Sequence, residues 1–242
     1  VPLGIRLLVG QGWGQGPQHS QSLQSIFAHI PGLKVIMPFT PHDAKGLLIS
    51  SIEDNNPVIF IEHRWLHGLF GEVPEESYNI PIGKARVAKK GNDITIVSSS
   101  HMTLEALKAA ECLEKDDIEA EVIDLRSLRP LDEDTIIESV RKTGHLIVAD
   151  GAWRFMSIST EIITMVTEKA FTSLKQPPCR ITFPDLPTPT SSALANHFYP
   201  RAIDILNKIE DLLGLSKKSE SEWGISPTGP LDVPDKSFTG PF

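Results

Sequence analysis

Along the first 63 residues, short apolar runs alternate with segments whose apolar residues have the spacing of a helix. Three apolar runs predict strands, at 1–9 (VPLGIRLLV), 31–38 (PGLKVIMP) and 56–63 (NPVIFIEH). Two segments between them space their apolar residues as a helix does, at 22–30 and 41–54. Pro41 stands where a helix tolerates proline best, in its first turn. The predicted order is therefore β-α-β-α-β.

The same alternation resumes after residue 92. Strands are predicted at 93–100, 119–127, 145–150 and 179–183, and helices at 104–115, 132–144, 157–171 and 202–214. Repeated βα units imply an α/β fold whose sheet is mostly parallel and covered by helices on both faces. The pattern predicts two successive α/β units, the first of them incomplete.

The segments around these units differ in composition. Residues 64–92 are rich in Gly, Pro and charge and show no helical period, with one strand predicted around 84–89. The end of the chain is again rich in Pro, Gly and Ser, and we expect a loop-like tail there, disordered or wrapped on a partner. We therefore predict four parts: 1–75, a linker at 76–92, 93–215, and a tail at 216–242.

Composition and charge argue against several classes of function. The chain has 242 residues and a net charge of −8, which disfavours nonspecific binding to nucleic acid or to an anionic membrane. No apolar run approaches a membrane span, no secretion signal is visible, and Cys112 and Cys179 lack metal-binding spacing. We expect a cytoplasmic protein, or one of the mitochondrial matrix in a eukaryote. Because Val1 already stands in a predicted strand, we also expect a fragment.

A glycine-rich stretch, GQGWGQGPQHSQS at 10–22, ends in the single histidine His19. It lacks the Lys of a phosphate-binding loop and the spacing of a dinucleotide fingerprint, and Pro17 is expected to block a helix start there. Two interpretations remain: a plain flexible loop, or a bend that brings His19 to the mouth of a cleft. If a helix begins just after His19, its dipole disfavours the imidazolium, and a neutral ring suits proton transfer.

Oxygen-rich residues follow the predicted helix 41–54. Asp54 and Asn56 lie next to carbonyls that a helix C-terminus leaves without partners, so the segment predicts either a site for a hard cation or an ordinary capped helix end. His63 and His67 are four residues apart but lack the HExxH order and a helical period, so no zinc site is predicted. No GxSxG nucleophile elbow is present.

Several long motifs, in order along residues 1–210, resemble the β subunit of thiamine diphosphate-dependent 2-oxo acid dehydrogenases of the pyruvate and branched-chain type, within the transketolase-like group. They include GQGPQHSQS, FAHIPGLKVIMPFTPHDAKGLL, SIEDNNPVIFIEHRWL and VIDLRSLRPLD. The resemblance implies that residues 1–75 are the later half of a pyrimidine-binding domain and that 93–215 are a transketolase C-terminal domain. It implies oxidative decarboxylation of a 2-oxo acid, with acyl transfer to lipoamide.

The resemblance also assigns site residues and partners. His19 matches the histidine that serves as proton carrier in the active-site channel. Five residues match the ligands of a structural potassium ion: Leu3, Ser51, Ile52, Asp54 and Asn56. The family binds thiamine diphosphate between subunits and holds magnesium on the α subunit, in a heterotetramer that also joins a second β subunit and a lipoyl acyltransferase core. In the family, the glutamate that hydrogen-bonds the aminopyrimidine ring of the cofactor lies in the earlier half of the pyrimidine-binding domain, which this sequence does not include. We therefore expect this chain alone to bind no cofactor and to be inactive.

Two alternatives stay open. The chain could belong to a split transketolase or synthase that transfers a two-carbon unit to an aldehyde, or it could be a non-catalytic docking module. The segment 153–162 (WRFMSISTEI) departs from the family's glycine-rich run, so its backbone or the pocket that it lines must differ.

Overall fold

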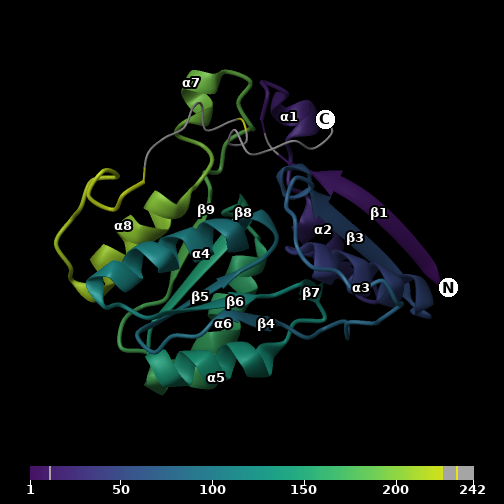
Figure 1. The fold of residues 1–242 in the computed structure, drawn as a ribbon, viewed down its shortest axis with the longest axis horizontal. Helices are drawn as coiled ribbons and strands as arrows, with labels where there is room; N and C mark the ends of the chain where they lie inside the picture. Colours follow the sequence, from purple (N-terminus) through teal and green to yellow (C-terminus); the bar gives the residue numbers. More distant parts are fainter. Residues whose placement is uncertain (11, 226–232, 234–242) are drawn as a thin grey trace.

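The computed structural model describes residues 1–10, 12–225 and 233, and it contains two sheets (Figure 1). The strands are β1 (Leu3–Val9), β2 (Lys34–Ile36), β3 (Pro57–His63), β4 (Arg86–Lys89), β5 (Ile94–Ser98), β6 (Ala120–Asp124), β7 (Ser127–Arg129), β8 (Leu146–Trp153) and β9 (Cys179–Phe183). The α-helices are α1 (Gly16–His19), α2 (Gln24–His29), α3 (Pro41–Glu53), α4 (His101–Leu113), α5 (Glu133–Thr143), α6 (Ile158–Ala170), α7 (Ser192–Ala195) and α8 (Ala202–Leu213). Three short 3₁₀ turns, at Arg64–Leu66, Glu114–Asp116 and Phe171–Ser173, complete the set.

The first sheet has the order β1-β3-β2-β7. Strands β1, β3 and β2 are parallel, and β7 is antiparallel to β2. The predicted strand 119–127 is therefore two strands in two sheets. The chain turns between them at Arg126, whose φ of +56° lies in the left-handed region. Sheet pairing thus crosses the predicted boundary, because a strand from the second unit completes the first sheet.

The second sheet has the order β4-β6-β5-β8-β9, and only β4 is antiparallel to its neighbour. Strand β4 comes from the stretch expected to be a linker. Successive residues of β5 face opposite sides: Ile96 packs in a core with α4 and α8, and Val97 packs in a core with α5 and α6. The mostly parallel sheet with helices on both faces is confirmed (Figure 1).

The two units share a core and a buried charge cluster. The core that holds Val97 also contains Val35 and Ile59 of the first sheet. Asp43, in the first turn of α3, accepts a hydrogen bond from Arg126 Nη1 at 3.2 Å and lies 3.5 Å from Arg86 Nη2. Arg86 also reaches Asp124, at 3.4 Å. Because these side chains come from both units and Asp43 and Asp124 are almost fully buried, the cluster fixes how the units meet.

The described part of the tail folds onto its own chain. Trp223 is 2% exposed and packs in the core beneath α4 and α8, and its Nε1 donates to Glu210 Oε1 at 3.0 Å. The rest of the predicted tail, 226–232 and 234–242, lies outside the described residues. No helix in the described ranges is long and apolar enough to span a membrane.

Candidate active site

The glycine-rich stretch forms a tight loop after β1. Gly10, Gly14 and Gly16 have backbone φ values of +148°, +68° and +54°, and residues other than glycine rarely adopt such positive values. Arg64 fastens the two ends of this loop together: its Nη2 donates to the carbonyls of Gly10 and His19, each at 3.0 Å. The loop is therefore held in one shape by a single guanidinium.

The loop also packs closely on the segment that leads into α7. A Cβ atom added to Gly16 would lie 2.3 Å from Thr190 Cγ2, and one added to Gly14 would lie 3.2 Å from the Thr190 carbonyl oxygen. Gly16 is thus required both by its backbone angle and by its neighbour.

The local setting predicted for His19 is wrong. Pro17 does not block a helix; it stands in the first turn of the one-turn helix α1, and His19 is the last residue of that helix. The next helix, α2, begins only at Gln24, because residues 20–23 turn away first. The argument from a helix N-terminus therefore does not apply to His19. The His19 side chain is exposed, and Arg64 anchors the loop by donating a hydrogen bond to the His19 carbonyl.

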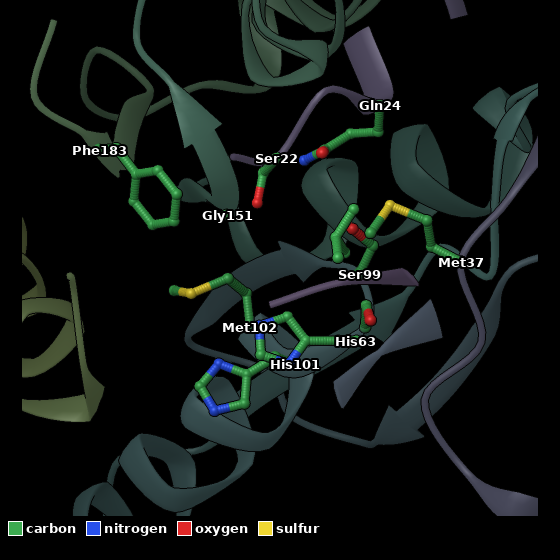
Figure 2. Close-up of a pocket in the computed structure, with 11 residues that line it drawn as sticks. Ser22, Gln24, Met37, His63, Ser99, His101, Met102, Gly151 and Phe183 are labelled. Carbon is green, nitrogen blue, oxygen red and sulfur yellow. The ribbon is translucent and has the colours of Figure 1, made fainter. Parts of the chain in front are cut away.

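Beneath this loop lies a small buried pocket where the carboxyl ends of β3 and β5 meet, the edge where α/β proteins bind ligands (Figure 2). His63 ends β3 and His101 begins α4 after β5, and their rings stack with centroids 4.6 Å apart and planes at 16°. Trp65 meets the His101 ring edge-on at 5.1 Å, and Trp13 of the glycine loop meets Trp65 at 6.3 Å. An aromatic cluster thus connects the loop to the pocket.

Both buried imidazoles are neutral. Burial lowers the pKa of His63 well below its usual value, and the nearby cations Arg64 and Arg201 lower it further. The Trp65 amide donates to His63 Nδ1 at 3.2 Å, so the ring proton is on Nε2. Burial likewise lowers the pKa of His101. The Glu105 carboxylate, 3.7 Å from His101, does not reverse this shift because Lys108 and Arg201 share its charge.

Polar groups line the pocket without complete partners. Ser100 Oγ and Gln24 Oε1 are buried and accept no hydrogen bond from the described residues. Ser100 also has φ +51° and ψ −130°, which is strained for a residue with a side chain. The cavity measures about 20 Å³, room for a single water molecule, so it suits a bridging water.

A buried carboxyl group lies next to two residues that line the pocket, Gln24 and Gly151. Asp150, at the middle of β8, accepts from Gln24 Nε2 at 3.3 Å and from the Ser159 amide at 3.2 Å. Burial raises its pKa to about 6, although these hydrogen bonds favour the charged form. Gln24 follows the HSQS motif (19–22) closely, so its hydrogen bond to Asp150 connects this region to the second sheet.

The five predicted potassium ligands lie at one end of the first unit. Leu3 pairs with Pro57 in the sheet, next to Asn56, and Ser51 and Ile52 are in the last turn of α3. The Asp54 carboxylate is engaged: Oδ1 accepts from the Asn56 amide at 2.8 Å, and Oδ2 pairs with Lys34. Burial alone would raise its pKa, but these bonds outweigh burial and lower it. The Asp54 carboxylate is therefore already paired, and the site stays a prediction.

The pocket under the glycine loop is too small for thiamine diphosphate. It has room for a single water molecule, and no three His, Cys, Asp or Glu side chains of the described ranges converge as metal ligands for a magnesium diphosphate.

Sequence reasoning missed the His63–His101 stack and the Gln24–Asp150 contact. Each joins residues far apart in sequence, and neither matches a motif. One signal was available: the run Ser98–Ser99–Ser100–His101 places four polar residues at the end of a buried strand and directly after it, where functional residues of parallel sheets gather.

Comparisons with known proteins identify the two units. Residues 83–205 match the family described as transketolase, C-terminal domain, and residues 1–68 match the transketolase pyrimidine-binding domain. A solved structure titled split gene transketolase, inactive beta4 tetramer, superposes with a TM-score of 0.71 at 24% identity, covering 88% of this chain and 67% of that one. That likeness supports the fold.

Curated relatives are more similar in sequence. The chain is 48% identical over 205 residues to the acetoin:2,6-dichlorophenolindophenol oxidoreductase subunit beta of Cupriavidus necator, covering 85% of this chain and 61% of the relative. It is 47% identical over 201 residues to the pyruvate dehydrogenase E1 component subunit beta of Bacillus subtilis, covering 81% and 62%. The chain thus spans about three fifths of each of these relatives. By these matches, the chain belongs to the transketolase family, with a pyrimidine-binding domain followed by a C-terminal domain.

Proposed function

We propose that this chain is the larger part of the β subunit of a thiamine diphosphate-dependent dehydrogenase of the 2-oxo acid type. The reaction is oxidative decarboxylation of a 2-oxo acid, or cleavage of a related ketone such as acetoin, with transfer of the acyl group to lipoamide. One observation carries the proposal: identity of 45–48% to β subunits with these names extends over 81–88% of the chain and so includes both units.

His19 is the proposed proton carrier of this reaction. It is the exposed histidine that ends the glycine loop, and Arg64 holds the backbone on both sides of that loop. An imidazole can donate a proton from one nitrogen and accept one at the other, which is what acyl transfer to a lipoyl sulfur requires. His63 and His101 are weaker candidates, because both side chains are buried and burial lowers the pKa of each ring.

The proposed assembly is a heterotetramer with an α subunit and a second β subunit, attached to a lipoyl acyltransferase core. Thiamine diphosphate lies between subunits and supplies the carbanion chemistry when bound, with magnesium on the α subunit. The compartment is the cytoplasm, or the mitochondrial matrix in a eukaryote. A structural potassium ion is proposed at Leu3, Ser51, Ile52, Asp54 and Asn56, supported by the free carbonyls expected at the end of α3.

The test uses the full-length gene product, coexpressed with its α subunit and loaded with thiamine diphosphate and Mg²⁺. Pyruvate, a branched-chain 2-oxo acid and acetoin are compared as donors with an artificial electron acceptor, and lipoyl domain and an aldose phosphate are compared as acyl acceptors. The proposal predicts turnover of one donor and transfer to the lipoyl domain. Transfer to the aldose phosphate in its place would assign a transketolase-like enzyme. No turnover with any donor would indicate a docking module.

A further inference from the structure

A positively charged hollow lies on the second unit, over β8, β9 and α8. Two adjoining depressions share three cations from three elements: Arg154 after β8, Arg180 on β9 and Lys208 on α8. Strands β8 and β9 are neighbours in the sheet and α8 packs beside them (Figure 1). On a chain of net charge −8, three clustered cations are an exception to the overall acidic surface.

Within the part of the chain that the structure describes, Arg154 and Arg180 have no acidic partner. No carboxylate of the described residues lies within 4.0 Å of either guanidinium. Arg180 is oriented by neutral oxygens instead: its Nη1 donates to Thr160 Oγ1 at 2.5 Å and to the Arg154 carbonyl at 3.0 Å. Lys208 only approaches Asp211, at 4.0 Å. Asp204 also lines the hollow, but its carboxylate accepts from the Arg201 amide at 2.7 Å.

The arginines repel one another at close range. Partial burial lowers the pKa of Arg180, and the charge of Arg154 lowers it further. A half-buried guanidinium that shares a hollow with a second one, with no counter-charge from the described residues, is the arrangement that an anion stabilises.

We propose that the hollow bounded by Arg154, Arg180 and Lys208 binds a phosphate dianion, either free or carried by a small phosphomonoester. A phosphate presents three acceptor oxygens to donors from several directions, and each arginine can contact two of them. A monocarboxylate has two oxygens and one charge, so it can satisfy only one of the guanidinium forks. His197 lines the adjoining depression, where it adds a donor for the organic part of a phosphomonoester.

The experiment is titration calorimetry on the full-length protein at constant ionic strength, with inorganic phosphate, glycerol phosphate and acetate as probes. Three single variants are compared with the wild type: Arg180→Gln, Arg180→Lys, and Arg141→Gln as control. Arg141 is an exposed arginine on α5, outside the hollow, and its Nη2 only approaches the Lys169 carbonyl at 3.4 Å. Thermal melts establish that each variant is folded.

We expect saturable phosphate binding that weakens at least tenfold in Arg180→Gln, less in Arg180→Lys, and not in Arg141→Gln. Acetate should bind at least tenfold more weakly than phosphate. Tighter binding of glycerol phosphate would assign the phosphomonoester, and equal binding would assign the free ion. Absence of saturable binding, equal affinity for acetate, or unchanged affinity in Arg180→Gln would each overturn the proposal. None of these results depends on catalytic activity, so the proposed function is tested separately.

Discussion

The rings of His63 and His101 lie face to face, 4.6 Å apart, although the two residues come from different units of the chain. Because burial lowers the pKa of both, the folded protein keeps them neutral while the unfolded chain protonates them as the pH falls through about 6.5. Each histidine then reduces the free energy of unfolding by about 1.4 kcal/mol per pH unit below that point.

We therefore predict that His101→Phe, which keeps a ring in the stack, loses less stability than the wild type on acidification from pH 7.5 to 5. Urea unfolding at several pH values measures this, and the informative quantity is the difference between variant and wild type. His29→Phe, at an exposed position on α2, is the control and should follow the wild type. Parallel pH profiles for His101→Phe and wild type would show that His101 is not kept neutral by the fold.

Asp124 is predicted to act in the opposite direction. Burial raises its pKa to about 7, with Asp43 raising it further and Arg86 opposing the shift. Between pH 4 and 7 the folded protein holds a proton on Asp124 that the unfolded chain releases, so its contribution to stability falls as the pH rises. Relative to Asp124→Asn, the wild type should lose about 1.4 kcal/mol per pH unit across this window. Asp134→Asn, on the exposed first turn of α5, should show no such trend.

Replacing Gly16 tests the packing of the glycine loop. Gly16→Ala combines a φ of +54° with a Cβ only 2.3 Å from Thr190 Cγ2, whereas Gly32→Ala has a φ of +90° and no neighbour within 4 Å. We expect Gly16→Ala to lower the melting temperature more than Gly32→Ala, and Thr190→Ser to recover part of that difference in the double variant. Equal losses in both glycine variants would mean that backbone angle alone matters.

The local periodicity of the chain was sufficient to predict the α/β class and the order of the longer strands and helices, but not the short elements α1, β7 and α7. It could not predict that 119–127 divides between two sheets, because the division depends on one left-handed residue, Arg126, and on pairing with Lys34–Ile36 far away in sequence. His19 was found by its motif, but its place at the end of a one-turn helix follows from the contacts of Arg64. The stacked histidines depend on tertiary contact alone.

The central claim is that the glycine loop presents His19 as the proton carrier for acyl transfer. His19→Ala and the exposed control His29→Ala are assayed in the full-length, α-paired enzyme, once with an artificial electron acceptor and once with lipoyl domain. The account predicts that His19→Ala slows transfer to the lipoyl domain by ~10²–10⁴-fold and decarboxylation far less, while His29→Ala changes neither. Equal losses in the two assays would contradict it, since His19 would then position the cofactor or substrate; no loss in either would leave it a structural residue of the loop.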